Sequence, residues 1–488
     1  MSIQLNTFFL ENDPDATLQH RIKRAVVEGI LSGRYRPGER MPSSRALAKH
    51  LDISRITVTI AYTDLVADDY LVARGRSGYF VSETAPSAPR FEVQSETNDG
   101  NFDWGRILSH RPPRALNISR PYDWQSYPYP FIYGQSDPSL FDHQNWRLCA
   151  LQALGQRDFT SLTLDQYERD DPKLIEYIQR HKTSRRGIRA RPENILITMG
   201  AQHALWITAQ LLLTQRRIAV IENPGYRGFR EILGETRCRV VEVDVDEKGL
   251  PPDSLPEQLD VVFATPSHHS PTNATMPMDR RKRLLELAEE RGFVIVEDDY
   301  EFELAFNRSP SPTLKSLDQS GCVVYIGSFS KSLFPGLRLG FIIGPTALIE
   351  QARALRSTMM RHPPWHIQRN AANFMSLGHY NAQINRMRKA FQRRRQVMET
   401  AIEQNGLTYA VPAQSGGSCF WMKAPDHVDT EELAMALRSR GVVIEPGHSF
   451  YARGSGPKNR YRLAYSSISS AKIPKGIELI AEEIARLD

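Results

Sequence analysis

Apolar side chains recur at helical spacing close to the start of the chain. Four aliphatic residues share one face of the segment TLQHRIKRAVVEGILS, residues 17–32, and this spacing predicts an amphipathic helix. These residues are Leu18, Ile22, Val26 and Ile30. Thr17 is placed to cap the first turn, because its hydroxyl can accept a hydrogen bond from a free backbone amide. Gly33 marks the end of this helix.

Two shorter helices and a strand pair follow the first helix. The segment SSRALAKHL, from Ser43, predicts a short helix, and SRITVTIAYTDLVADD, from Ser54, predicts another after a tight turn. The segment YLVARGRSGYFVS, residues 70–82, predicts two strands around a basic turn. Two helices joined by a tight turn are typical of a helix-turn-helix unit, and the strand pair is typical of a wing.

Such a unit presents the start of its last helix to the major groove of DNA. An arginine there can donate two hydrogen bonds to a guanine edge, and arginines nearby can neutralise phosphates. The candidate DNA contacts are Ser54, Arg55 and Thr57 on the last helix, Arg45 on the helix before it, and Arg74 and Arg76 in the wing. The alternative interpretation is a small docking module with scattered surface arginines.

Periodicity is lost after the wing and returns later in a different form. Residues 83–126 are rich in Pro, Ser, Asn and charge, which predicts a linker. From residue 127 to 488, short β-rich runs such as RIAVIE and FVIVED alternate with helical segments such as DRRKRLLELAEERG. Alternating strands and helices predict an α/β domain with a mainly parallel sheet.

Composition narrows the class of protein without deciding it. The net charge is +6, a mild excess that permits a nucleic-acid partner. The four cysteines are isolated, so we expect neither disulfides nor a metal site. The start of the chain does not read as a signal peptide, and no run reaches the roughly 18 apolar residues of a membrane span. We therefore expect a cytoplasmic protein without a membrane partner.

The segment GSFSKSLFPGLRLG carries the clearest chemistry. A lysine beside hydroxyls suits a Schiff base with a cofactor aldehyde, and here it is Lys331. Ser328 and Ser330 can bind a phosphate group, and Arg338 can grip it with two hydrogen bonds. The alternative interpretation is an ordinary surface lysine.

Two segments upstream complete this pattern. FVIVEDDYEFEL ends a strand in Asp298 and Asp299, and one of these carboxylates would keep a pyridine nitrogen protonated. In ILITMGAQHALW, the turn at Gly200 begins a helix whose amides at Ala201 and Gln202 would meet a phosphate.

Two basic runs in this part have no assigned role. RHKTSRRGIRARP, from Arg180, is interpreted as a solvated loop in preference to a second DNA contact. RMRKAFQRRR, from Arg386, is interpreted as a solvated helix face.

These motifs together resemble a known arrangement over almost the whole chain. Residues 1–82 resemble the GntR-type winged helix, and residues 127–488 resemble the fold-type I aminotransferases, which end in a small α+β subdomain. The combination is similar to the MocR-type transcription regulators. Many aminotransferases have an Asn-Pro motif where this chain has TPSHHSPTN, and the resemblance places His268 or His269 in that region.

The resemblance implies pyridoxal 5′-phosphate (PLP) as cofactor and a role for each matching residue. Lys331 would form the Schiff base, Asp298 would meet the pyridine nitrogen, Tyr300 and His268 would lie near the ring hydroxyl, and Tyr226 would lie against the ring. The implied phosphate ligands are Ser328, Ser330, Arg338, Ala201 and Gln202. Arg462, with Arg460 as rival, would grip the acid group of an effector.

The resemblance also implies how such a protein works. An amino compound, with taurine as the favoured candidate, would form an external aldimine in place of Lys331 and change binding to double-stranded operator DNA. Activation is the expected sign of regulation, and a head-to-tail homodimer with exchanged winged helices is the expected assembly. The alternatives are an active aminotransferase and a regulator that senses PLP itself.

Overall fold

The computed structural model describes residues 2–86 except 12 and 15, then 103–108, 121–304, 311–412, 417–452 and 456–487. The chain divides into two units, Met1–Ser109 and His110–Asp488, which are described separately below. Most of the predicted linker lies outside the described residues; it includes one helical turn, α4 (Trp104–Ile107).

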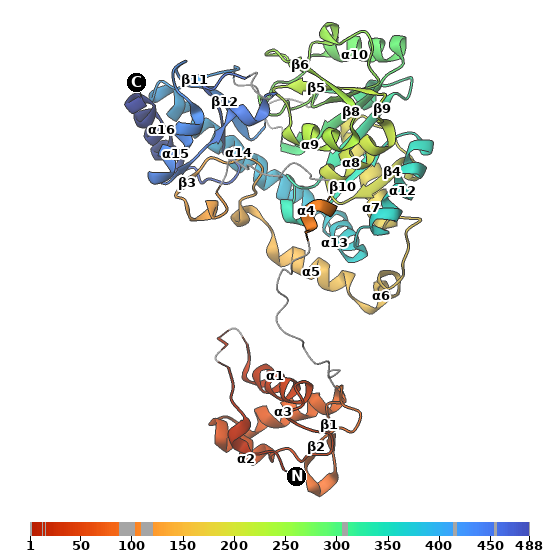
Figure 1. Cartoon of the computed structure of the whole chain (residues 1–488), viewed down its shortest axis with the longest axis vertical. Helices are drawn as coiled ribbons and strands as arrows, with labels where there is room; N and C mark the ends of the chain where they lie inside the picture. Colours follow the sequence, from red (N-terminus) through yellow and green to blue (C-terminus); the bar gives the residue numbers. More distant parts are fainter. Residues whose placement is uncertain are drawn as a thin grey trace. The chain divides into compact units, whose positions relative to one another are not determined.

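The first unit is a winged helix-turn-helix, as predicted. Its elements, labelled in Figure 1, are α1 (Leu18–Leu31), α2 (Ser44–Leu51), α3 (Arg55–Ala67), β1 (Leu71–Ala73) and β2 (Tyr79–Val81). β1 and β2 pair antiparallel, with Leu71 opposite Val81. The Thr17 hydroxyl accepts from the backbone amide of His20, so the predicted N-cap is confirmed, and the Ser43 hydroxyl caps α2 by accepting from the amide of Ala46.

One buried cluster holds the three helices together. Ile22, Val26 and Ile30 on α1 are buried against residues of α2 and α3. Leu18, predicted on the same face, is 40% exposed because it opens the helix at the edge of the unit. The turn between α2 and α3 contains Asp52 in the left-handed region, with φ of 55°.

The second unit is built on a seven-stranded sheet. The strand order is β4-β10-β9-β8-β7-β5-β6, and every neighbouring pair is parallel except the two formed by β10. The strands are β4 (Ile195–Thr198), β5 (Ile218–Asn223), β6 (Arg239–Asp244), β7 (Val261–Ala264), β8 (Val294–Asp299), β9 (Val323–Ser328) and β10 (Gly340–Ile343). The predicted α/β class with a mainly parallel sheet is confirmed.

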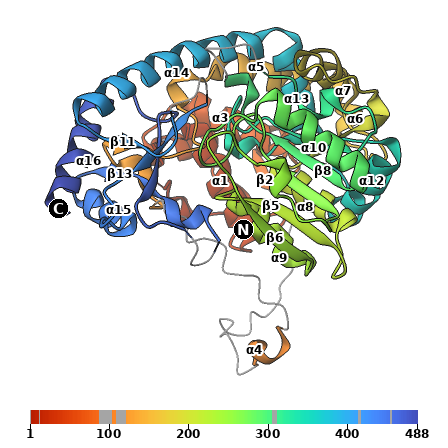
Figure 2. The same cartoon turned by 90° about the horizontal axis from the view of Figure 1, so that it is seen from above.

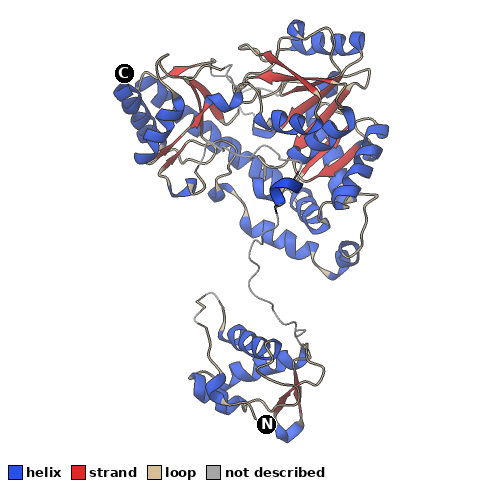
Figure 3. Ribbon diagram, viewed as in Figure 1, coloured by secondary structure: helices blue, strands red, loops and turns tan. Residues whose placement is uncertain are grey.

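Helices surround this sheet, as Figure 3 shows by colour. They are α5 (His143–Ala153), α6 (Gln156–Leu162), α7 (Pro172–Tyr177), α8 (Ala201–Leu212), α9 (Arg227–Thr236), α10 (Met278–Arg291), α11 (Leu314–Leu317), α12 (Thr346–Met360) and α13 (Trp365–Ser376). The strands other than the edge strand β6 are buried almost throughout, which is expected of a parallel sheet covered on both faces.

A smaller α+β lobe completes the second unit. The long helix α14 (His379–Gln404) runs along the sheet lobe and the small lobe (Figure 2). The small lobe has a four-stranded antiparallel sheet, β11-β12-β15-β14, and two helices. These elements are β11 (Thr408–Tyr409), β12 (Cys419–Lys423), β14 (Glu445–Pro446), β15 (Arg460–Ala464), α15 (Thr430–Ser439) and α16 (Ile473–Leu487). A further parallel pair joins β3 (Tyr129–Pro130) to β13 (Val442–Val443).

This topology brings distant motifs to one edge of the large sheet. β8 ends at Asp299 and β9 ends at Ser328, and the two strands are parallel neighbours. In open α/β sheets, ligands bind outside the carboxyl ends of the strands. Among the described residues, no helix has the length and apolar character needed to cross a membrane.

Candidate functional site

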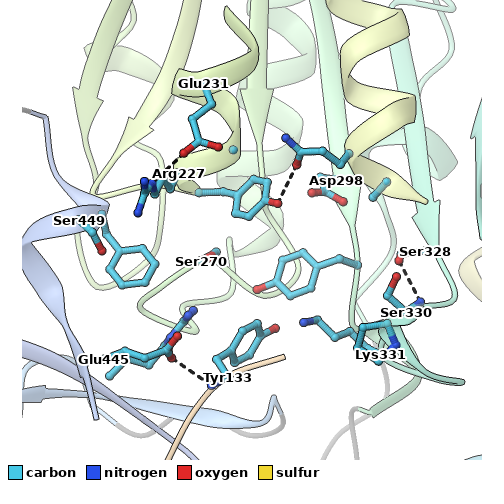
Figure 4. Close-up of a pocket in the computed structure, with 18 of the residues that line it drawn as sticks. Tyr133, Arg227, Glu231, Ser270, Asp298, Ser328, Ser330, Lys331, Glu445 and Ser449 are labelled. Atoms are coloured by element: carbon cyan, nitrogen blue, oxygen red, sulfur yellow. Dashed lines mark hydrogen bonds and ion pairs between the residues drawn. The ribbon is translucent and has the colours of Figure 1, made fainter. Parts of the chain in front are cut away.

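A cavity of about 590 Å³ opens at this edge, between the large sheet and the small lobe (Figure 4). Ten of the residues predicted from sequence line it: Ala201, Gln202, Tyr226, Asp298, Tyr300, Ser328, Ser330, Lys331, Arg338 and Arg462. In Figure 4, Ser328, Ser330 and Lys331 lie along one wall, and Glu445 and Ser449 lie on the opposite one.

Lys331 follows the last residues of β9 and points into this cavity. Its Nζ lies 4.3 Å from the centre of the Tyr133 ring. Burial lowers the pKa of Lys331 to about 8, so an appreciable fraction of its amine is neutral near physiological pH. Gly134 passes so close that an added Cβ would lie 2.4 Å from Nζ. Glycine at this position therefore makes room for a reactive amine.

The two neighbouring aspartates have different surroundings. Asp299 Oδ2 accepts from Arg186 Nε at 2.7 Å and from the Tyr325 hydroxyl at 2.9 Å. Its Oδ1 has no partner, but Asp299 does not line the cavity. Asp298 lines the cavity, and its buried Oδ1 has no hydrogen-bond partner. Burial raises the pKa of Asp298 to about 8. The geometry favours Asp298 as the carboxylate that faces a bound cation.

The segment after β7 differs from the prediction for His268. The ring of His268 is buried and does not line the cavity; its backbone carbonyl accepts a hydrogen bond from the Tyr300 hydroxyl at 2.8 Å. Ser270 lines the cavity instead. His269 is also turned away, with its Nδ1 2.7 Å from the Thr272 hydroxyl. The imidazoles pack inside the protein because this loop folds back on itself, and the shorter serine remains at the surface of the cavity.

An anion cradle forms at the start of α8. Ala201 and Gln202 are the first residues of this helix, where backbone amides lack helical partners and attract negative charge. Arg338 reaches the same place, and its Nη2 donates to the Met199 carbonyl at 3.2 Å. The Tyr226 hydroxyl donates to Gln202 Oε1 at 2.9 Å, which fixes the ring over the cavity.

The small lobe supplies an arginine that lies over the same aromatic ring as the lysine. Arg462 on β15 lies with its Cζ 4.1 Å from the centre of the Tyr133 ring. Its Nε donates to Glu445 Oε2 at 2.9 Å, and the Tyr133 amide donates to the same oxygen at 3.0 Å. Burial by itself lowers the pKa of Arg462, but the Glu445 carboxylate together with Cys419 and Tyr133 outweighs it, so the pKa is raised. The rival Arg460 does not line the cavity and bonds Asn459.

Two family models match the chain. Residues 18–81 match the bacterial regulatory proteins of the gntR family, and residues 138–480 match the class I and II aminotransferases. The HTH-type transcriptional regulator TauR of Rhodobacter capsulatus is 56% identical over 99% of this chain and 100% of its own length. The probable rhizopine catabolism regulatory protein MocR of Rhizobium meliloti is 28% identical over 98% of this chain and 96% of its own.

The chain belongs to the MocR-type transcription regulators.

The larger unit of this MocR-type regulator also resembles a solved enzyme. Kynurenine aminotransferase of Pyrococcus horikoshii, crystallised in complex with PMP, superimposes with a TM-score of 0.70. The two are 28% identical, over 78% of this chain and 96% of the enzyme. The cofactor of the MocR-type regulator is therefore PLP, as predicted.

The residues present fit this cofactor. Lys331 would offer an amine to the aldehyde, and the Asp298 carboxyl, whose Oδ1 has no partner, would meet the pyridine nitrogen. The cradle at α8 and Arg338 offer donors to the phosphate. PLP, when bound, supplies an aldehyde that condenses with amines and a ring that withdraws electrons.

The DNA-facing residues predicted for this regulator lie on the surface of the first unit. Arg55 and Ser54 are exposed at the start of α3, and Thr57, two residues after Arg55, is half-buried. The Ser54 hydroxyl accepts from the Ile56 amide, and Ile56 itself is 71% exposed. Arg45 on α2 and the wing residue Arg76 are exposed as well. Arg74 is exposed over the Phe80 ring, with its Cζ 4.8 Å from the ring centre.

Several residues of the cavity were missed from sequence. Tyr133 lies some distance from every motif, and nothing local marks it. Glu445 can be recognised as a residue of the cavity only once the strands are paired, because the register of β14 and β15 places it opposite Arg462. Ser270 had a signal: it precedes a proline, as the asparagine of the Asn-Pro motif does.

Proposed function

We propose that this PLP-dependent DNA-binding transcription regulator senses a short amino acid or amino sulfonate by amine exchange at Lys331. The observation that carries this proposal is the pairing of Lys331 and Arg462 on one aromatic ring. Their amine and guanidinium groups lie 4.3 and 4.1 Å from the centre of the Tyr133 ring, so they cannot be more than 8.4 Å apart. The cavity therefore offers an amine site and an acid site within this distance.

This span limits the length of the effector. A hydrogen bond between a guanidinium and an acid oxygen already takes up about 3 Å. The remaining distance suits a compound with a short linker between its amine and its acid group. Taurine, with two carbons between nitrogen and sulfur, meets this requirement, and the similarity to TauR supports testing it first.

Charge limits the effector further. Glu445 neutralises Arg462, and Arg227 on the same cavity pairs with Glu231 through a 2.8 Å hydrogen bond. The wall opposite Lys331 therefore carries little net charge. An effector with one acid group fits it better than a diacid, which would add an uncompensated charge to a buried site.

The chemistry at Lys331 needs no oxidant or reductant. Bound PLP would supply an aldehyde carbon for either amine, so an effector amine would take the place of the Lys331 amine there and leave Lys331 as a free amine. Release removes a covalent link between the segment after β9 and the cofactor. A ligand shifts an equilibrium between two conformations only by its different affinity for them. We propose that this exchange changes how the sheet lobe and the small lobe close around the cavity. In this proposal the closed conformation places two winged helices on operator half-sites as a head-to-tail homodimer, and this activates transcription.

An absorbance titration tests this proposal. Purified protein is titrated with taurine, γ-aminobutyrate, alanine and glutamate, beside Lys331→Ala as control. We expect one short mono-acid amine to shift the visible band of the bound cofactor, with no amino transfer to a keto acid. Repeated amino transfer would favour an aminotransferase. DNA affinity that follows PLP occupancy without any amine would favour a sensor of PLP itself.

A further inference from the structure

Two basic runs that appear solvent-facing in sequence meet at a second cavity of the larger unit. The cavity has a volume of about 330 Å³ and lies between residues 177–185 and the start of α14. Its polar lining includes His181, Lys182, Arg185, Glu303, Tyr380 and Arg388. The runs from Arg180 and from Arg386 thus contribute to one site, although they are far apart in the chain.

The floor of this cavity is a buried ion pair. Lys182 is 4% exposed, and its Nζ lies 2.5 Å from Glu303 Oε1. The Tyr380 hydroxyl donates to the same oxygen at 2.9 Å. Lys182 also donates to the Ser328 carbonyl at 3.0 Å, so the floor adjoins the strand that leads to Lys331. Lys182 offsets the charge of Glu303 within this pair, and the Glu303 carboxylate also opposes the fall in the pKa of Arg388.

Two guanidinium groups on the rim lack such compensation. Arg185 donates to the amide oxygen of Asn381 at 3.2 Å, and Arg388 donates to the backbone carbonyl of Glu303 at 2.6 Å. Both acceptors are neutral, and within the described part of the chain neither arginine forms an ion pair with a carboxylate. Burial, and then the charge of Arg185, lower the pKa of Arg388, as expected of two cations that face each other.

We propose that this cavity binds a small dianion that carries a phosphate or sulfate group. Two arginines with free donors match the geometry of such an oxyanion, and their excess of two positive charges matches its charge. Ligand clefts commonly measure about 300–1,000 Å³, so the cavity has room for a small organic phosphate as well as the free ion. The site is separate from the PLP cavity and does not depend on the effector chemistry at Lys331.

Calorimetric titration of the PLP-loaded protein tests this site. The probes are inorganic phosphate, sulfate, glycerol 2-phosphate and, as a monoanion, acetate. We expect the dianions to bind more tightly than acetate. We also expect Arg388→Gln, or the exposed Arg185→Gln, to lower the affinity for the dianions at least about tenfold, the usual size of a lost charge-assisted hydrogen bond. Tighter binding of glycerol 2-phosphate than of phosphate identifies an organic ligand; equal binding identifies the free ion.

Arg386→Gln is the matched control. It removes the same charge from the same helix, but Arg386 lies 3.6 Å from Asp142 and does not line the cavity. If Arg386→Gln lowers the affinity for the dianions equally, the proposed site is overturned, and the binding reflects general attraction to a positive surface. Loss of binding in Arg338→Gln with no loss in Arg388→Gln would assign the anion to the PLP cradle. If Arg388→Gln dissociates into monomers and its anion binding is unchanged, the arginines belong to an interface between two copies of this chain, and the proposed anion site is overturned.

Discussion

Replacing Asp298 with asparagine should make the cofactor-free protein less sensitive to pH while weakening its hold on PLP. The pKa of this carboxyl rises from 3.8 to about 8 on folding, mainly through burial and further through the charges of Asp299 and Glu222. Between these two values the group takes up a proton on folding. Its stabilising contribution is complete below pH 3.8 and is lost as the pH rises through about 8.

The size of this effect follows from the pKa values. Between the two pKa values of Asp298, each pH unit lowers the free energy of unfolding by about 1.36 kcal/mol. Between pH 5 and pH 7, the free energy of unfolding of the wild type should therefore fall by ~2.7 kcal/mol more than that of Asp298→Asn, because asparagine does not titrate. All other groups titrate in both proteins, so the difference isolates Asp298. Urea denaturation of the cofactor-free proteins at several pH values, followed by circular dichroism, measures it.

Asp299→Asn is the control, because the same substitution at the next residue should destabilise the protein instead of making its stability less sensitive to pH. It breaks the buried pair with Arg186, which should cost about 3–5 kcal/mol at pH 7. Asp298→Asn should also release PLP more readily, since an amide offers no charge to the pyridine nitrogen. Equal pH dependence in wild type and Asp298→Asn, or unchanged PLP retention, would refute the assignment of Asp298.

Three further variants test other parts of the account. Arg55→Ala should cost about 1–3 kcal/mol of operator binding and relax base preference at one position, which a binding-site selection would detect. Arg45→Ala should weaken binding to all DNA sequences alike and reduce the salt dependence of binding, since a phosphate contact carries no sequence information. A loss of affinity for some DNA sequences only would contradict this. Glu445→Gln should increase the response to diacids such as glutamate relative to taurine in the absorbance titration, because Arg462 then carries an uncompensated charge. An unchanged ratio would mean that Glu445 does not set charge selectivity.

The sequence was sufficient wherever a function rests on a continuous motif. The segment around Lys331 contains the amine and the hydroxyls, and the start of α8 contains two amides; all of these line one cavity. The winged helix was predictable for the same reason, since its caps and turns are local. Alternating strands and helices similarly indicated the parallel sheet.

Features that depend on distant pairing were not predictable. The position of the Tyr133 ring beside both Lys331 and Arg462 depends on how the small lobe packs against the sheet. His268 was assigned to the cavity because it lies in the right segment, but the loop after β7 turns its ring inward. The choice between Asp298 and Asp299 also required the structure, since only Arg186, far away in sequence, decides which carboxylate is already paired.

The central claim is that effector sensing passes through Lys331, and a transcription reporter tests it most directly. The protein and Lys331→Ala are compared on a promoter that the protein binds, with and without taurine. We expect taurine to change transcription with the wild type, and Lys331→Ala to bind the promoter without any response to taurine. A taurine response that survives in Lys331→Ala would contradict amine exchange at this lysine.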